Sequence, residues 1–253
     1  CHITVESVSP GVWPHLGHAH SAVLGDVCAR FARLTGSNVV YTAAVSDTGS
    51  SAVVAAAERG VTSEVLCEDF LHRMLCLAER LRVTSEVPDS HQEAAHELWR
   101  RCEASGDVYL GDFSGWYSMR EERFIEEAEA LRTGFIDPVS TEPLIRTECQ
   151  SYYFRLSRYG PAVSDLLSNN FLVPERRRDE VLARLMREPL RDVPISRNDV
   201  VGMPSPHPGH VMHVAFDNLA RYLTGDFLLG KAPPAELHVV GRGGEWTHAV
   251  LWP

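Results

Sequence analysis

The chain has 253 residues, of which 44% are hydrophobic and 23% are charged, a composition that is ordinary for a soluble globular protein. No apolar run approaches the roughly 18 residues that a membrane-spanning helix needs, and no signal-peptide pattern is present. We therefore expect a cytoplasmic protein that binds no membrane. A formal net charge of −10 disfavours nucleic-acid binding unless basic residues cluster locally. The strongest basic run, residues 176–178, is typical of a solvated helix face.

The N-terminal part of the chain predicts alternating strands and helices. Residues 3–8 read as a strand, and because the chain opens at Cys1 directly with this run, we expect that residues are missing before it. Apolar residues recur at helical spacing over 19–34, residues 39–43 read as a second buried strand, and 51–59 read as a helix. This βαβ pattern predicts a parallel sheet.

The remainder of the chain changes character twice. Amphipathic helices are predicted at 64–82 and 90–105, and aromatic residues interleaved with glycine and aspartate then indicate a β-rich insertion at 107–155. A helical pattern resumes over about 161–189. Near the end, two strands, each followed by a short helix, are predicted: strands at 211–216 and 237–240, and helices at 218–223 and 246–252.

The six cysteines stand at positions 1, 28, 67, 76, 102 and 149, and no two of them form a CxxC pair. Structural zinc sites usually take their thiolates from such closely spaced pairs. We therefore predict that the protein holds no structural zinc and that its cysteines are free thiols in a reducing compartment.

The run His15-Leu16-Gly17-His18 carries the most chemical content, because it lies after a strand and a turn and just before a helix. Unpaired N–H groups at a helix N-terminus favour anions, so two histidines one turn apart can face a triphosphate there. Their imidazoles can donate hydrogen bonds to the charge that builds up as pyrophosphate leaves, and Gly17 lets an adenine ring approach the backbone. With His20 the spacing also suggests a metal motif, but the three side chains would spread around the helix start, so we expect no metal there.

A second glycine-rich segment, Gly241 to Gly244, follows the strand predicted at 237–240. Ligands of open α/β sheets bind at the carboxyl ends of the strands, and the strand at 3–8 ends shortly before His15. We therefore predict that ATP or an adenylate binds between the two segments.

Several segments, in order along the chain, resemble methionyl-tRNA synthetase, a class I aminoacyl-tRNA synthetase. Residues 14–30 are similar to that family's HIGH motif and the helix that follows it. Residues 106–118 resemble its connective insertion in the form without zinc cysteines, and 151–157 resemble the segment where the insertion returns. Further similar segments, which include the family's Ser-Arg motif, lie at 195–197, 213–217 and 239–253.

The resemblance implies an α/β fold, the Rossmann-type parallel sheet of a class I synthetase with a β-rich connective insertion. We expect the first half of the catalytic domain at 1–106, the insertion at 107–158, and a second half at 159–253 that is incomplete at its C-terminus. The family's lysine-rich KMSKS loop and helical anticodon-binding domain, which follow this point in the family, are absent from the chain, whose single lysine is Lys231.

The resemblance also implies a set of site residues, with His15 and His18 as the catalytic pair. ATP, with Mg²⁺, is expected to contact this pair together with Gly11, Gly17, Arg197, Gly241, Gly243 and Glu245. The amino acid is expected to contact Ser7, Ser46, Asp47, Ala215, Tyr222 and His248.

The chain departs from the family at four of the aligned positions. Ser46 stands where the family has an acidic residue that holds the substrate's amino group, although Asp47 is beside it. Ala215 stands in place of a tryptophan that closes over the methionine side chain, and Ser9 in place of a tyrosine. Gly243 stands where an acidic residue grips the ATP ribose. Because these changes enlarge the pocket and alter its polarity, we expect that the amino acid is not methionine.

The favoured function is therefore ATP-dependent activation of an amino acid to an aminoacyl adenylate, with a changed substrate and either tRNA or a small molecule as acceptor. Three alternatives stay open. They are a genuine methionine–tRNA ligase fragment, the synthetase-like domain of a hydrazine synthetase that joins two amino-acid nitrogens in specialised metabolism, and a non-catalytic binding module. Intact His15 and His18 disfavour the last alternative, whereas the missing lysine-rich loop favours it.

Overall fold

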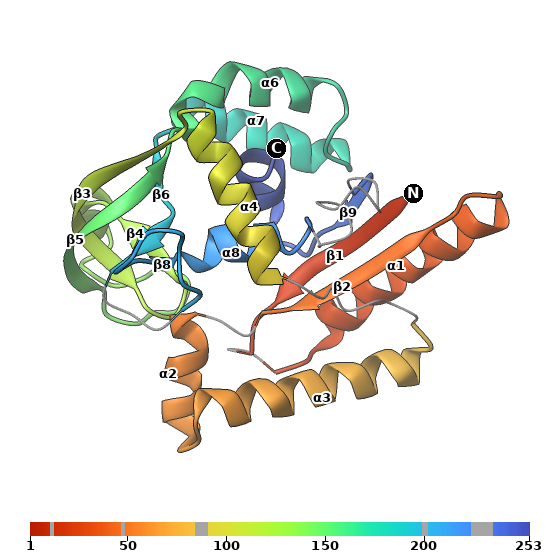
Figure 1. Ribbon diagram of the computed structural model, residues 1–253. Coiled ribbons are helices and arrows are strands. Elements are labelled where there is room, and N and C mark those ends of the chain that lie inside the picture. Colours follow the sequence, from red (N-terminus) through yellow and green to blue (C-terminus); the bar gives the residue numbers. More distant parts are fainter. Residues whose placement is uncertain (11–12, 47–48, 84–90, 199–201, 224–234) are drawn as a thin grey trace.

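The computed structural model describes the chain except for residues 11–12, 47–48, 84–90, 199–201 and 224–234. A short parallel sheet runs through the molecule, with helices α1 (Leu16–Leu34) and α3 (Ser63–Leu81) along one side of it (Figure 1). A separate antiparallel sheet lies beyond the carboxyl ends of the parallel strands (Figure 1). The arrangement places two sheets of opposite type next to each other in one α/β fold.

The parallel sheet consists of β1 (His2–Val8), β2 (Val40–Val45) and β9 (Leu237–Val239) in the order β2-β1-β9. β1 pairs in parallel with both neighbours, so that Thr4 lies opposite Thr42 on one side and opposite His238 on the other. The carboxyl ends of all three strands therefore meet at the same edge of the sheet. The predicted Rossmann-type parallel sheet is confirmed.

The two faces of β1 differ in chemistry because side chains alternate along a strand. Ile3 and Val5 pack against Ala29 of α1 and against Tyr41 of β2 in a hydrophobic core. Gly25 allows this close approach of α1, since a Cβ at that position would lie 2.7 Å from the Tyr41 hydroxyl oxygen. The opposite face of β1 carries polar side chains and is covered by the C-terminal part of the chain.

Two further helices lead from β2 to the antiparallel sheet, and both agree with the predicted ones. They are α2 (Ser50–Arg59) and α4 (His91–Ala104). Trp99 of α4 is fully buried, and its ring meets those of Tyr152 and Phe216 edge to face. This second core fixes α4 between the antiparallel sheet and α8 (Val214–Ala220).

Residues 108–154 form antiparallel strands, as the aromatic-rich composition predicted. β3 (Val108–Ser118) pairs with β5 (Ile145–Phe154), and β4 (Arg123–Ile125) and β6 (Val193–Pro194) complete the order β4-β3-β5-β6. The short helix α5 (Glu127–Arg132) in this region was not predicted. Because β6 joins this sheet from a later part of the chain, the division of the chain at 106 and 158 stays a prediction.

The helical pattern predicted over 161–189 consists of two helices. α6 (Gly160–Ser168) ends before residues 169–174, and α7 (Glu175–Arg187) begins after Pro174. Proline lacks the N–H that the interior of a continuous helix would need, and here it occupies the position just before the first turn of α7.

The strand predicted at 211–216 is also wrong over most of its length. β8 covers only Val211–Met212 and pairs antiparallel with β7 (Ser196–Arg197). α8 begins at once, because Nδ1 of His213 accepts a hydrogen bond of 3.3 Å from the backbone N–H of Ala215 and so caps the helix. The last helical element is a short π-helix, η2 (Thr247–Leu251).

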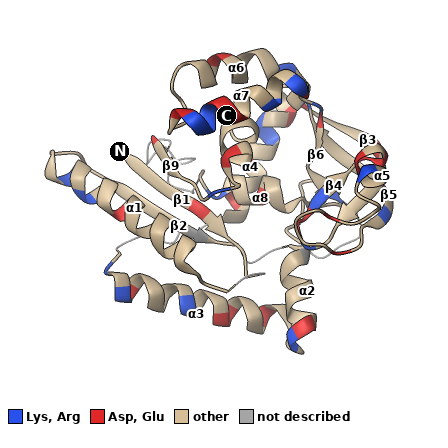
Figure 2. Ribbon diagram, turned by 180° about the vertical axis from the view of Figure 1, so that it is seen from behind, with Lys and Arg blue, Asp and Glu red and all other residues tan. Residues whose placement is uncertain are grey.

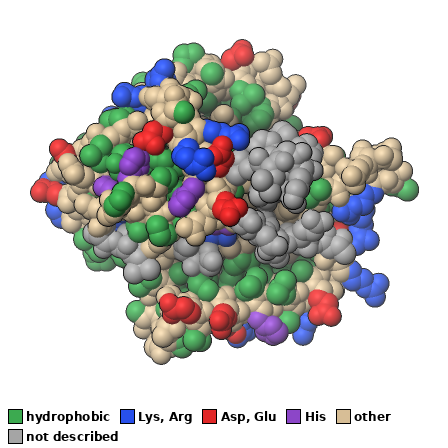
Figure 3. All heavy atoms as spheres, in the orientation of Figure 1, with side chains coloured by type: hydrophobic (Ala, Val, Ile, Leu, Met, Phe, Trp, Pro, Cys, Tyr) green, Lys and Arg blue, Asp and Glu red, His purple; other side chains and the backbone are tan. Residues whose placement is uncertain are grey.

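The surface of the described part shows charges of both signs. Both acidic and basic residues lie along α3 (Figure 2), and both signs are interspersed over the face seen in Figure 3, so neither sign forms one broad patch among the side chains drawn in colour. Among the helices that the structure describes, none is long and apolar enough to span a bilayer.

His238 on β9 is held as a neutral imidazole. The indole N–H of Trp252, which can only donate, gives a hydrogen bond of 3.0 Å to its Nε2, and Nδ1 lies 2.6 Å from Oγ1 of Thr4. A proton on Nε2 would remove the acceptor that Trp252 needs. Burial, with a smaller contribution from the charges of His248 and His2, lowers the pKa of His238 to about 4.

We predict that the protein loses stability as the pH falls from 6.5 towards about 4. The unfolded chain protonates His238 near pH 6.5, whereas the folded chain does so only near pH 4, so acid favours the unfolded state in this window. The His238 contribution to the free energy of unfolding should fall by roughly 2 kcal/mol between about pH 7 and about pH 5. Urea unfolding at the two pH values, for the wild type and for His238→Gln, measures it.

The control is His72→Gln on the exposed side of α3, which should keep the pH dependence of the wild type. If His238→Gln keeps the full wild-type pH dependence as well, the assignment to His238 is wrong.

Candidate active site

His15 and His18 lie together at the N-terminus of α1, where the sequence placed them. His15 is the N-cap residue, and its Nδ1 accepts a hydrogen bond of 3.0 Å from the backbone N–H of Gly17. The backbone N–H of His15 in turn donates to Nδ1 of His18 over 3.3 Å, and the two rings stack with centroids 3.9 Å apart. Because each Nδ1 accepts a hydrogen bond, each neutral ring carries its proton on Nε2. The pair therefore supplies two Nε2–H donors at the positive end of a helix dipole.

Two features keep this pair in its arrangement. Burial, reinforced by the nearby charge of His15, lowers the pKa of His18 below its ordinary value, so His18 is neutral at pH 7. Gly17 leaves room for the capping ring, since a Cβ there would lie 2.8 Å from Cε1 of His15. The requirement for glycine at this position thus has a local cause in addition to the expected approach of an adenine ring.

A buried hydrogen-bonded chain joins three of the predicted amino-acid contacts. The backbone N–H of Ser7 donates to the Tyr222 hydroxyl over 3.2 Å, and that hydroxyl lies 2.7 Å from Nε2 of His248. Nδ1 of His248 faces the carbonyl oxygen of Gly244 at 2.9 Å, so it must be the donor. In the neutral ring Nε2 then accepts from the tyrosine O–H, and in the protonated ring Nε2–H would donate to the tyrosine oxygen. All three hydrogen bonds of this network can form with a neutral His248 ring.

The turn from Gly241 to Gly244 follows β9 and lies beside β1, as predicted. Oε2 of Glu6 accepts a hydrogen bond of 2.8 Å from the backbone N–H of Gly241. Sequence reasoning did not single out Glu6, although an acidic side chain in a mostly buried strand is itself an unusual feature. Glu6 thus joins the predicted site residues at the carboxyl end of the sheet.

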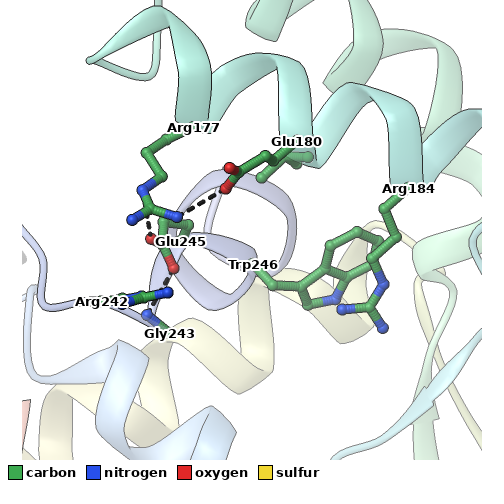
Figure 4. Close-up of a pocket in the computed structure, with 8 residues that line it drawn as sticks. Arg177, Glu180, Arg184, Arg242, Gly243, Glu245 and Trp246 are labelled. Atoms are coloured by element: carbon green, nitrogen blue, oxygen red, sulfur yellow. Dashed lines mark hydrogen bonds and ion pairs between the residues drawn. The ribbon is translucent and has the colours of Figure 1, made fainter.

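The outer side of the same turn borders a pocket of about 290 Å³ between the turn and α7. Figure 4 shows Arg177 reaching from α7 toward Glu245, at 3.5 Å, and the guanidinium of Arg184 stacked on the Trp246 ring at 3.8 Å. Glu245 also accepts a hydrogen bond of 2.7 Å from the backbone N–H of Gly243. The basic run predicted as a solvated helix face therefore contributes one residue, Arg177, to a pocket wall.

The remaining predicted site residues have different surroundings. Ser46 is fully buried just after β2, and its backbone N–H donates to the carbonyl oxygen of Val8 over 2.7 Å. Ala215 lies in the first turn of α8. The buried guanidinium of Arg197 stacks on the Tyr117 ring of the antiparallel sheet at 3.9 Å, so its expected contact with ATP stays a prediction. Gly11 and Asp47 lie outside the described residues.

The cysteines give no sign of a metal site in the part of the chain that the structure describes, where no group of three or more His, Cys, Asp or Glu residues could hold an ion. Cys102 packs in the core around Trp99, and burial, aided by the charge of Asp107, raises the pKa of its thiol to about 11. Such a thiol is protonated at neutral pH, whereas zinc binds thiolates. That the protein holds no structural zinc stays a prediction.

Comparisons with known proteins agree with this geometry. A family model described as tRNA synthetases class I (M) matches residues 3–134 and 129–231. The methionine–tRNA ligase of Mycobacterium bovis is 38% identical over an alignment that covers 100% of this chain and 52% of the relative. The corresponding ligase of Brucella suis is 32% identical, with the same coverage of 100% and 52%. The chain thus spans about half the length of the curated relatives it matches.

Solved structures give the same result. Methionyl-tRNA synthetase of Mycobacterium tuberculosis in complex with methionyl-adenylate is 36% identical, with a TM-score of 0.88 over 100% of this chain and 53% of that chain. The apo form of the Mycobacterium tuberculosis enzyme is 34% identical, with a TM-score of 0.78 over 100% of this chain and 52% of that chain. The agreement covers the parallel and the antiparallel sheet together.

We predict that His18 titrates below the ordinary pKa of histidine and that His15→Ala raises the pKa of His18. The substitution removes the neighbouring charge that opposes protonation and opens the ring to water, and both effects favour the charged form. NMR titration of the His18 ring protons measures the change. Leu16→Ala, at a position 85% exposed in the same helix turn, is the matched control and should leave the titration in place. An identical His18 pKa in all three proteins would contradict the stacked arrangement.

Proposed function

The chain belongs to the class I tRNA synthetase family, and on that premise we propose that it activates an amino acid. ATP and the amino acid react to give an aminoacyl adenylate and pyrophosphate. The observation that carries the proposal is the stacked His15–His18 pair at the start of α1, at the same sheet edge as the Gly241–Gly244 turn. Such a reaction requires two parts. One is a set of donors suited to a triphosphate, and the other is a glycine-lined turn after the neighbouring strand.

In the proposed reaction the carboxylate of the amino acid attacks the α-phosphate of ATP. Negative charge then grows on the departing pyrophosphate, and hydrogen bonds from Nε2–H of His15 and of His18 stabilise it. Both rings are already fixed through their Nδ1 atoms, so their donors need no reorientation as the charge develops. Neither ring takes up a proton in this step, which agrees with the lowered pKa of His18.

Mg²⁺ would arrive with the triphosphate. Magnesium prefers oxygen ligands and usually binds through substrate phosphates, whereas the described residues at the start of α1 offer imidazole and backbone N–H donors. These donors fit the phosphate oxygens, and the ion would neutralise the remaining phosphate charge. The protein's own contribution is therefore to hold and orient the triphosphate.

The amino acid would lie near the chain of Ser7, Tyr222 and His248. The saturated hydrogen bonds of this chain give a fixed wall in which the tyrosine and histidine offer no free N–H or O–H donor. At the positions where the family has a tryptophan and an acidic residue, Ala215 and Ser46 leave more space and less charge. We therefore propose a substrate other than methionine. Transfer to tRNA or to a small molecule, and a cytoplasmic location, belong to the same proposal.

The adenylate-bound relative supports a nucleotide function over a binding module without a nucleotide. The chain is similar in structure over its whole length to a relative solved with methionyl-adenylate, at 36% identity and a TM-score of 0.88. A module that had lost its nucleotide would have no reason to keep both capping histidines in register.

We predict that the full-length protein binds α,β-methylene-ATP, a non-hydrolysable analogue of ATP that keeps the triphosphate, and that the His15→Ala, His18→Ala double variant binds it at least tenfold more weakly. The loss follows from two hydrogen bonds to charged oxygens, each worth roughly 1.5–3 kcal/mol. Isothermal titration calorimetry measures it. His20→Ala, on an exposed position of the same helix, should bind like the wild type. Unchanged affinity in the double variant, or no binding by the wild type at millimolar concentration, would refute the assignment.

We also predict that methionine is a poor substrate. Removing a packed tryptophan costs roughly 3–5 kcal/mol of contact, and even half of that weakens binding by more than about tenfold. Amino-acid-dependent pyrophosphate exchange over a panel with apolar, hydroxylated and basic amino acids tests this. Methionine as the clearly best substrate would show that neighbouring side chains fill the space, and exchange with no amino acid would favour a non-catalytic module.

A further inference from the structure

Glu6 is the charged group of the site that the proposed reaction does not use. It lies near the carboxyl end of β1, on the strand face opposite Ile3 and Val5, and it is partly buried under the Gly241–Gly244 turn. The same face carries Thr4, whose hydroxyl contacts His238. Alternation along the strand therefore directs Glu6 toward the part of the chain that contains Tyr222 and His248.

The turn is shaped around this carboxylate. Gly244 is buried, and a Cβ at its position would lie 2.2 Å from Oε1 of Glu6 and 2.7 Å from Cγ1 of Val240. A Cβ at Gly241 would lie 3.0 Å from Oε2 of Glu6. The two glycines thus leave the space that the Glu6 side chain occupies, and any larger residue at 244 would displace it.

The Glu6 carboxylate has no arginine partner among the described residues, and the charge of the nearby His248 ring offsets its burial only in part. None of the described arginine or lysine side chains forms an ion pair with it, and its one hydrogen bond comes from the backbone N–H of Gly241. The two ring nitrogens of the nearby His248 form hydrogen bonds with the carbonyl oxygen of Gly244 and the hydroxyl of Tyr222. Burial raises the pKa of the Glu6 carboxyl, and the His248 ring and the Gly241 N–H offset this only in part.

A purely structural role does not explain a carboxylate here. Holding the Gly241 N–H needs only a neutral acceptor, which an amide or hydroxyl side chain supplies without the cost of desolvating a charge. A buried carboxylate that pairs with no described arginine is instead accounted for by a cationic partner that arrives with the ligand. The nearby carboxylate of Glu245 adds repulsion, which makes an incoming cation still more favourable.

We propose that the carboxylate of Glu6 binds a protonated amine of the substrate amino acid and thereby selects the substrate. This inference rests on the proposed function. The amine is either the α-amine, whose usual carboxylate partner the family resemblance places at Ser46, or an amine on the side chain. In both cases a charge-assisted hydrogen bond forms in a partly dry site beside Tyr222 and His248, where such bonds are strong.

Two matched pairs of sulfamoyl adenosines test the proposal with the full-length protein. Glycyl and acetyl sulfamoyl adenosine differ only in the α-amine, and lysyl and norleucyl sulfamoyl adenosine differ only in the side-chain amine. Calorimetry gives the Kd of each for the wild type and for Glu6→Gln. The glutamine keeps an acceptor for the Gly241 N–H, so the turn should persist and the melting temperature at pH 7 should not fall.

The expected result is a loss of at least tenfold in Glu6→Gln for the amine-bearing member of one pair, with its amine-free partner unchanged. A loss within the glycyl–acetyl pair assigns Glu6 to the α-amine, and a loss within the lysyl–norleucyl pair assigns it to the side chain. Glu6→Asp, which keeps the charge, should retain part of the preference. Glu79→Gln, at an exposed position of α3, should match the wild type for all four ligands.

Equal weakening of all four ligands in Glu6→Gln would make Glu6 a structural support of the turn and overturn the proposal. No weakening of any amine-bearing ligand would overturn it as well. In both cases the wild type still binds the adenosine part, so the proposed function survives. If the wild type binds none of the four ligands, the proposed function fails and the assignment of Glu6 fails with it.

Discussion

The parallel pairing of β1 with both β2 and β9 is the constraint on which the rest of the site depends. Parallel strands bring their carboxyl ends to one edge, so segments far apart in sequence meet there: the start of α1, Ser46 after β2, and the Gly241–Gly244 turn after β9. The apolar side chains of β1 lie on one face of the strand, and its polar side chains lie on the other. Hydrophobic packing therefore stabilises the sheet on one face, and the polar residues of the candidate site lie on the other.

Neutral histidines define the electrostatics of this edge. His18 and His238 each have a ring nitrogen that must accept a hydrogen bond, because its neighbour can only donate. A ring fixed in this way cannot gain a proton without losing a hydrogen bond, so these residues act as oriented dipoles. The proposed reaction would benefit from donors whose positions do not depend on pH near neutrality. The corresponding cost is that acid, which protonates such buried rings, destabilises the folded protein.

Periodicity and local chemistry made much of the fold and of the candidate site predictable from the sequence. The βαβ unit, the parallel sheet and the position of His15 at a helix start follow from patterns within about twenty residues, which sequence displays directly. The break at 169–174 and the early start of α8 depend on a proline and a capping histidine inside apolar runs, so periodicity alone missed them. Glu6 and Arg177 were missed for another reason: each belongs to the site only through contacts across more than sixty positions, with Gly241 and with Glu245.

The relation between Glu6 and Gly244 shows how such a site can change its ligand without changing its fold. The backbone of β1 and of the turn keeps its parallel register, and only the volume at 244 and the charge at 6 differ from what an apolar pocket would need. Placing a carboxylate in this space costs stability, because burial opposes its ionisation. Removing the Cβ at 244 avoids a clash but does not offset that cost. Burial thus disfavours the charged carboxylate in the free protein. In the proposed recognition a cationic group on the ligand favours it, so binding energy and selectivity arise from the same charge.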